Sequence, residues 1–192
     1  IGYRDIGDTQ LMLDTALTHQ HAVVVGGGLL GLEAANGLTL RGMQVTVIHK
    51  GQWLLDRQLD ERAGKQLQTA LERRGIRFRL GTPPKQLRGN KGGRVCAVDF
   101  NDGTSVAADL VVMAAGIRPN IQLAERAGLA CNGGILVNDT LQTFGPRIYA
   151  IGECVSHRGI AYGLVAPLFE QAKVCANHLA RLGYQRYLGS VT

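Results

Sequence analysis

A short apolar run near the start of the chain breaks into glycines and then continues as a helical pattern. From residue 23 the sequence reads Val-Val-Val-Gly-Gly-Gly-Leu-Leu-Gly, which places Gly26, Gly28 and Gly31 at the spacing Gly-x-Gly-x-x-Gly. In this pattern the first glycine allows a tight turn, the second lets the backbone approach a pyrophosphate, and the third lets a helix pack against a strand. The spacing therefore predicts a cradle for the phosphates of a dinucleotide.

The residues around these glycines are typical of a strand, a helix and a second strand. Residues 22–25 are a continuous apolar run, as expected for a strand buried on both faces of a parallel sheet. Residues 29–40 have a helical pattern, and residues 44–48 form the second strand. One βαβ unit is therefore expected, and the backbone N–H groups of Leu29 and Leu30 stand at the positive end of its helix, where phosphates bind.

The rest of the chain also predicts alternating helices and strands. Glycine and basic residues between 83 and 103 indicate an antiparallel excursion, and residues 148–151 look like a buried strand. After residue 117 the strands are too few for a sheet of their own, so this stretch is interpreted as part of a second domain. The expected helices are 8–19, capped by Asp8 or Thr9, 60–74, 123–127 and 167–181, and the other strands are 76–80, 95–100, 105–107, 110–114 and 133–137.

Composition excludes several classes of function. The net charge of +6 comes from basic residues spread along the chain, and aromatic residues make up only 5%, so a solvated surface explains the charge better than nucleic-acid binding. No apolar stretch approaches the roughly 20 residues of a membrane helix. The four cysteines, Cys96, Cys131, Cys154 and Cys175, lie far apart and indicate reduced cytoplasmic thiols rather than a metal site. The chain begins with Ile1, not Met, and is interpreted as a piece of a longer protein.

Three motifs in order resemble a known family. They are Gly26-Gly-Gly-Leu-Leu-Gly-Leu-Glu33, Val111-Val-Met-Ala-Ala-Gly-Ile-Arg-Pro-Asn120, and Thr143-Phe-Gly-Pro-Arg-Ile-Tyr-Ala-Ile-Gly-Glu153. Together they resemble the FAD-dependent pyridine nucleotide-disulphide oxidoreductases, in which an NAD(P) domain is inserted into an FAD domain. The resemblance implies an α/β fold with a Rossmann-like, three-layer NAD(P)-binding domain and a partial second domain of the FAD type.

Within this family the sequence is most similar to the large subunits of assimilatory NAD(P)H nitrite reductases. The similarity is carried by residues 27–35, by Arg57-Gln-Leu-Asp60, and by Gly152-Glu-Cys-Val-Ser-His-Arg-Gly159 with Tyr162-Gly-Leu-Val-Ala-Pro167. Such proteins pass a hydride from NAD(P)H to FAD, and then electrons to an iron–sulfur centre and sirohaem, where nitrite becomes ammonium.

The resemblance also implies how the chain is divided. Residues 1–20 are expected to be a linker from the first FAD half, residues 21–117 the NAD(P)-binding domain, and residues 118–192 the C-terminal part of the FAD domain. The first FAD half, with its own glycine motif, is not in this sequence, so the chain is expected to hold FAD weakly and to lack activity alone. Its expected partners are that half, the iron–sulfur and sirohaem domains or a redox protein. The oligomeric state stays open, a homodimer included.

On the nicotinamide side, the resemblance assigns roles to three residues. Glu33, placed on the first turn of the helix, is expected beside the nicotinamide and flavin rings, as the candidate catalytic residue. The alternative is that its charge only complements the helix dipole. Ala115 and Gly116 follow the returning strand, and Gly116 permits close approach of the cofactor. Arg118 fits a surface residue equally well.

On the flavin side, the resemblance points to the segment after residue 151. Gly152 and Glu153 correspond to the family's second FAD motif, whose acid binds a ribityl hydroxyl; the alternative for Glu153 is a cap on the following segment. Val165, with Tyr162 and Pro167, falls where the family lines the pyrimidine edge of the flavin. A helix beginning near Pro167 directs its positive end at the ring.

The second strand of the βαβ unit ends without an acid, which bears on the choice of nucleotide. A carboxylate at this place accepts hydrogen bonds from the adenosine ribose and repels a 2′-phosphate. Here the sequence has His49 and Lys50, with Arg57 further on, and these basic groups pair well with a 2′-phosphate. The pattern favours NADPH, although His49 and Lys50 are also explained as solvated residues.

Two other interpretations of the function stay open. One is a stand-alone reductase that feeds rubredoxin, ferredoxin or a separate nitrate or nitrite reductase subunit. The other is an NAD(P)-sensing module without turnover. The histidines have no evident partners and are interpreted as surface or capping residues: His19, His21, His157 and His178. Because the cofactors carry the chemistry of hydride transfer, no catalytic triad is expected.

Overall fold

The computed structural model describes residues 1–190 and divides the chain into two compact units. The first unit comprises Ile1–Gly116 and the second Ile117–Thr192. Among the described residues, no helix is both long and apolar enough to cross a membrane.

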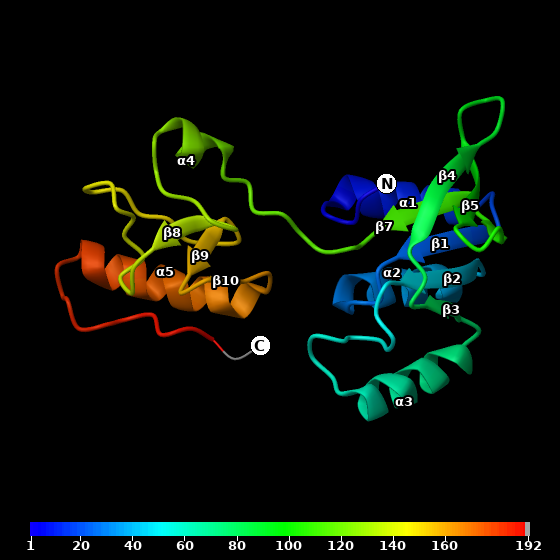
Figure 1. The fold of residues 1–192 in the computed structure, drawn as a ribbon, viewed down its shortest axis with the longest axis horizontal. Helices are drawn as coiled ribbons and strands as arrows, with labels where there is room; N and C mark the ends of the chain where they lie inside the picture. Colours follow the sequence, from blue (N-terminus) through cyan, green and yellow to red (C-terminus); the bar gives the residue numbers. More distant parts are fainter. Residues whose placement is uncertain (191–192) are drawn as a thin grey trace. The chain divides into compact units, whose positions relative to one another are not determined.

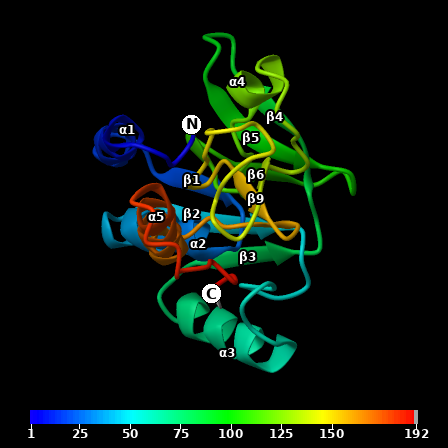
Figure 2. The ribbon, with the colours of Figure 1, turned by 90° about the vertical axis from the view of Figure 1, so that its left-hand side faces the viewer.

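A parallel sheet of four strands forms the centre of the first unit. Its order is β3 (Arg77–Leu80), β2 (Gln44–His49), β1 (His21–Val25) and β7 (Leu110–Met113). Figure 2 shows β1, β2 and β3 stacked side by side. Helix α2 (Leu29–Leu40) connects β1 to β2, so the expected βαβ unit is confirmed. The carboxyl ends of all four strands lie at one edge of the sheet.

Side chains that alternate along β1 bury both faces of this sheet. Val24 faces a core shared with α1 (Ile6–Ala16), α2 and α3 (Glu61–Glu72). Val23 and Val25 face a second core, closed by the antiparallel sheet of β4 (Pro84–Gly89), β5 (Val95–Phe100) and β6 (Ser105–Ala107) (Figure 1). The predicted three-layer arrangement of helices, parallel sheet and antiparallel sheet is therefore confirmed.

Two elements of this unit differ from expectation. Helix α1 runs from Ile6 to Ala16. It begins at Ile6 because the carboxylate of Asp5 caps it, accepting from the N–H of Asp8 at 2.8 Å. The cap is therefore neither Asp8 nor Thr9. Met12 of this helix packs into the core of the first unit. Strand β4 was not expected, since its sequence is mostly exposed and has no apolar alternation.

The second unit has a small sheet and a long helix. Strand β9 (Val155–His157) pairs in parallel with β8 (Ile135–Val137) and antiparallel with β10 (Ile160–Ala161). The expectation that this stretch has too few strands for a sheet of its own was wrong. The sequence did not indicate β9 and β10, because they are short and follow a glycine motif that is typical of a loop. Helix α5 (Val165–Leu179) packs on this sheet through Val174 and Cys175, and α4 (Gln122–Arg126) is short.

The buried strand expected at residues 148–151 is not formed. Tyr149 makes only an isolated bridge with Gln142. Ile148 and Ile151 are 42% and 41% exposed, so they do not enter the core of this unit. A continuous apolar run is typical of a strand that pairs within a sheet covered on both faces. Among residues 117–190, residues 148–151 make only this isolated bridge and join no sheet.

Candidate functional site

The turn from β1 into α2 depends on two glycines that allow close packing. Gly26 has φ +129°, and a Cβ there would overlap the carbonyl oxygen of Ala114 on the neighbouring chain segment. Its N–H donates to the carbonyl of Ile48 at 2.8 Å. A Cβ on Gly31 would overlap the carbonyl oxygen of Gly26, so α2 sits directly against the end of β1. Both positions exclude any larger residue.

Gly28 has a different environment, which is open. Its φ of −85° is ordinary, and a Cβ on it would meet nothing within 4 Å. Gly28 is the N-cap of α2, and no side chain caps the helix there. The N–H groups of Leu29 and Leu30 in the first turn thus have no intrahelical acceptor, and both residues are exposed. A bare backbone beside open space at a helix N-terminus fits a pyrophosphate.

Glu33 lies on the exposed side of α2, as the fifth residue of the helix. The first turn contains no acidic residue, so the expected placement of Glu33 on that turn was wrong. One turn further along, the carboxylate gains little from the helix dipole, whose effect falls off after the first turn. Dipole complementarity therefore does not account for an acid at this position.

The residues after β7 also reach the carboxyl edge of the sheet. Ala115 and Gly116 are both exposed, and β7 pairs with β1 up to Val25, just before the cradle. Gly116 has φ +99°, and a Cβ there would meet nothing within 4 Å. The structure thus brings Ala115 and Gly116 to the same edge as Gly26 and Gly28.

His49 ends β2 and is buried, with 8% of its surface exposed. Its Nδ1 accepts a hydrogen bond from the N–H of Gly27 at 3.2 Å. His49 is therefore not the solvated residue that one sequence interpretation allowed, whereas Lys50 and Arg57 are exposed. The strand end carries no acid, as the sequence indicates, but the loop after it does: Asp56 Oδ1 lies 3.5 Å from His49 Nε2.

In the second unit, a buried glutamine holds the Gly152-Glu153 turn. Gln171 on α5 is fully buried, and its Oε1 accepts from the N–H of Gly152 at 2.8 Å. Gly152 has φ +98°, a backbone angle that residues with a side chain rarely adopt. Sequence reasoning missed Gln171, although its signal is a polar residue on the otherwise apolar face of α5 that holds Pro167, Val174 and Cys175.

The three residues expected at the flavin edge separate in the structure. Val165 is exposed and begins α5, whose N-cap, Leu164, makes no side-chain hydrogen bond. Tyr162 and Pro167 are buried, and Tyr162 packs edge-on against Tyr187. Of these three residues, only Val165 is exposed.

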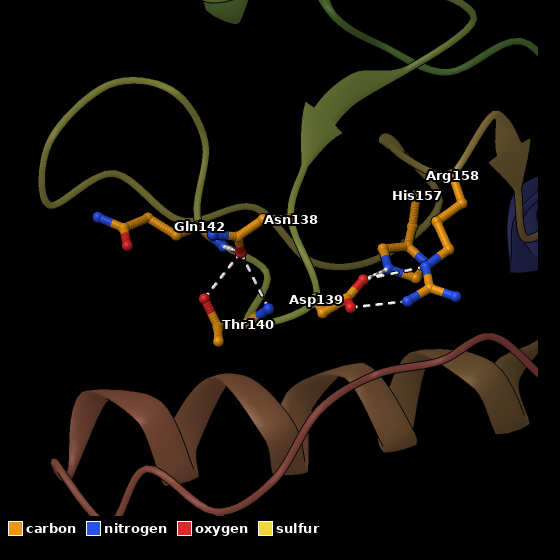
Figure 3. A network of polar contacts seen from close by, with 6 residues as sticks. All are labelled: Asn138, Asp139, Thr140, Gln142, His157 and Arg158. Carbon is orange, nitrogen blue, oxygen red and sulfur yellow. Dashed lines mark hydrogen bonds and ion pairs between the residues drawn. The ribbon is translucent and has the colours of Figure 1, made fainter.

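The interpretation of the histidines as unpartnered was wrong. His157 is fully buried, and its Nε2 lies 2.9 Å from Asp139 Oδ1. Arg158 binds the same carboxylate through two hydrogen bonds, of 3.0 and 2.7 Å (Figure 3). The Arg158 and His157 hydrogen bonds lower the pKa of Asp139 to about 2. His178 Nδ1 likewise meets the hydroxyl of Tyr149 at 2.9 Å, and His21 lies 3.4 Å from Asp109.

A hollow of about 1010 Å³ lies at the other edge of the central sheet. Its lining includes His21, Gln44 and Arg77, the first residues of β1, β2 and β3. Ligands of open α/β sheets bind outside the carboxyl ends of the strands. The hollow at the amino ends is therefore a separate feature from the cradle.

Comparison with known proteins agrees with this geometry. The chain is 53% identical over 189 residues to a nitrite reductase [NAD(P)H] of Bacillus subtilis. The aligned region covers 98% of this chain but 23% of that protein. It is 48% identical to the assimilatory nitrate reductase electron transfer subunit of the same organism, with 98% of this chain and 24% of that protein covered. The structure superimposes with a TM-score of 0.87 and 28% identity on the ferredoxin reductase of the CYP199A2 system from Rhodopseudomonas palustris, covering 93% of this chain and 46% of that one.

The chain thus spans about a quarter of the length of these two Bacillus relatives. The sequence pattern of the pyridine nucleotide-disulphide oxidoreductases matches residues 2–178, which is most of the chain. This match, together with the glycine cradle at the carboxyl edge of a parallel sheet, shows that the chain belongs to the pyridine nucleotide-disulphide oxidoreductase family.

Proposed function

We propose that this chain is the nucleotide-binding part of a flavoprotein oxidoreductase that transfers a hydride from NAD(P)H to FAD. The observation that carries the proposal is the open backbone at Gly28, set between two glycines that allow only close packing. FAD, when bound, accepts the hydride and releases electrons singly. The chain itself holds the pyrophosphate of the nicotinamide nucleotide on the N–H groups of Leu29 and Leu30, and Glu33 faces the nicotinamide.

The second unit is proposed to contribute the remaining part of an FAD site. In this proposal Gly152 and Glu153 bind the ribityl chain, and the N–H groups at the start of α5, beside Val165, meet the flavin. Support comes from exposed apolar side chains on this unit: Phe144 is 86% exposed, and Val165 and Phe169 are each 66% exposed. Apolar residues gathered at a surface mark an interface. We infer that the first half of the FAD domain covers them.

For the terminal acceptor, we propose nitrite, reached through an iron–sulfur centre and sirohaem outside this chain. The identity with a Bacillus subtilis nitrite reductase supports this choice. A stand-alone reductase is the second candidate, favoured by the similarity to an electron transfer subunit and to a ferredoxin reductase. The sequence that follows residue 192 in the parent protein decides between the two candidates. Cysteines that ligate sirohaem favour the nitrite reductase, and their absence favours the stand-alone reductase.

Titration of the purified 192-residue chain with NADH, NADPH and FAD tests the proposal. We expect saturable binding of a nicotinamide nucleotide, and weak binding of FAD. Stoichiometric yellow protein would contradict the expected weak binding of FAD, and no nucleotide binding would contradict the proposed function. An NAD(P)-sensing module instead predicts nucleotide binding without diaphorase activity in the full-length flavoprotein.

A further inference from the structure

Gly27 in the cradle makes one hydrogen bond to the end of β2 and one to the loop that follows it. The N–H of Gly27 donates to His49 Nδ1, and its carbonyl accepts from the N–H of Leu55 at 3.0 Å. Leu55 has φ +54°, which is unfavourable for a leucine, and the adjacent Leu54 is fully buried. The loop is thus anchored beside the cradle, and the anchor fixes the residue that follows it, Asp56.

The hydrogen bond from Gly27 also determines where the proton of the His49 ring lies. Because Nδ1 accepts this bond, the neutral ring carries its proton on Nε2. Nε2 is buried and has no hydrogen-bond partner among the described residues. The carboxylate of Asp56 lies 3.5 Å from it. His49 therefore carries its N–H on the ring nitrogen that lies close to the carboxylate of Asp56, at the end of β2.

The carboxylate of Asp56 lies close to Gly51, two residues after the end of β2. A Cβ on Gly51 would come within 2.5 Å of Asp56 Oδ2 and 2.7 Å of His49 Nε2. Even so, the side chain of Asp56 keeps 34% of its surface exposed. This carboxylate therefore occupies the carboxyl edge of β2 next to the cradle, and it has free acceptor positions for a ligand.

We propose that Asp56 is the residue that recognises the adenosine ribose, and that it makes the site selective for NADH over NADPH. This inference rests on the proposed function. A carboxylate at this place accepts from both ribose hydroxyls and repels a 2′-phosphate. The acid that the end of β2 lacks is thus supplied by the loop, with His49 as the positioning residue. Lys50 and Arg57 then lie beside a negative charge that offsets their attraction for a 2′-phosphate.

The test uses ADP-ribose and its 2′-phosphate, which lack the nicotinamide and so report on this end of the site alone. Binding of each to the 192-residue chain is measured by calorimetry. We expect tighter binding of ADP-ribose, and in Asp56→Asn a shift of the affinity ratio toward the 2′-phosphate by about tenfold, the effect of losing hydrogen bonds to a charged group. Asp56→Ala is expected to shift it in the same direction.

Glu61→Gln is the matched control, since Glu61 is exposed five residues further on and forms an ion pair with Lys65. It removes the same charge and is expected to leave the ratio unchanged. An unaltered ratio in Asp56→Asn, or a shift of the same size in Glu61→Gln, overturns the role of Asp56. If the wild-type chain binds the 2′-phosphate more tightly, the inferred selectivity is wrong. If it binds neither probe, the proposed function fails, and this inference fails with it.

Discussion

At the level of single residues, the three glycines of the cradle are needed for different physical reasons. Gly26 and Gly31 make room for neighbouring backbone, whereas Gly28 leaves room for something outside the chain. The sequence pattern predicted all three. It did not predict that His49 is buried beneath Gly27, or that a carboxylate lies beside it. A residue brought in by a loop leaves no periodic signal, so Asp56 becomes evident only from the structure.

Substituting the glycines separates stability from binding. We expect Gly28→Ala to lower the free energy of unfolding by no more than about 1 kcal/mol, because alanine fits there but is a poor N-cap. Binding of NADH should weaken by about tenfold, since the methyl group keeps the pyrophosphate from the backbone. Gly31→Ala should cost about 3 kcal/mol, because its Cβ overlaps the carbonyl of Gly26. Denaturant unfolding and nucleotide titration of both variants check this, and equal losses of stability would contradict it.

The low pKa of Asp139 makes the stability of the chain depend on pH. Its folded-state pKa of about 2 lies below the ordinary value of 3.8, so the charged form stabilises the fold above about pH 4. That contribution is lost as the pH falls toward 2. Because the carboxylate is a third exposed, solvent screening reduces the contribution to about 1 kcal/mol.

Asp139→Asn should therefore lower the free energy of unfolding by about 1 kcal/mol at pH 7, and by less at pH 3. Denaturant unfolding at both pH values measures the difference. Glu125→Gln on α4 serves as a control, since no ion pair of Glu125 is found in the part of the chain that the structure describes. A deficit in Asp139→Asn as large at pH 3 as at pH 7 would refute this assignment.

At the level of elements, sequence periodicity succeeded where the elements are long and buried on both sides. The unit of β1, α2 and β2 was predicted closely, because parallel strands are continuous apolar runs. β4 was missed as a largely exposed edge strand, and β9 and β10 as strands of two or three residues. The strand expected at residues 148–151 is absent for the opposite reason: these residues are apolar, but among residues 117–190 they join no sheet.

Helix α3 follows the loop that carries Asp56, and its N-cap is Asp60. The carboxylate of Asp60 accepts from the N–H of Ala63 at 2.8 Å. We expect Asp60→Ala to destabilise the chain by about 1 kcal/mol, the usual effect of losing a side-chain cap. Asp60→Ser retains an acceptor and should restore most of this loss. If Asp60→Ala unfolds at the same denaturant concentration as the wild-type chain, the cap contributes nothing to stability.

At the level of the whole molecule, each unit has a hydrophobic core of its own. The first has an apolar cluster on each face of its sheet, and the second has one cluster, which includes Leu141, Val155 and Val174. Both units also leave large apolar side chains exposed, among them Leu17 in the first and Phe144 in the second. The chain covers about a quarter of its Bacillus relatives; that further sequence packs against the second unit is part of the proposed function. The nucleotide cradle, by contrast, lies wholly in the first unit, so it can be tested in this chain alone.

The most direct test of the account is to map where a dinucleotide binds. Backbone amide resonances of the chain are followed by NMR during titration with NADH. The account predicts saturable shifts confined to the cradle from Gly27 to Gly31, to the loop around Asp56, and to Ala115 and Gly116. Shifts centred instead on His21, Gln44 and Arg77 at the amino edge of the sheet, or no shifts at saturating NADH, would contradict it.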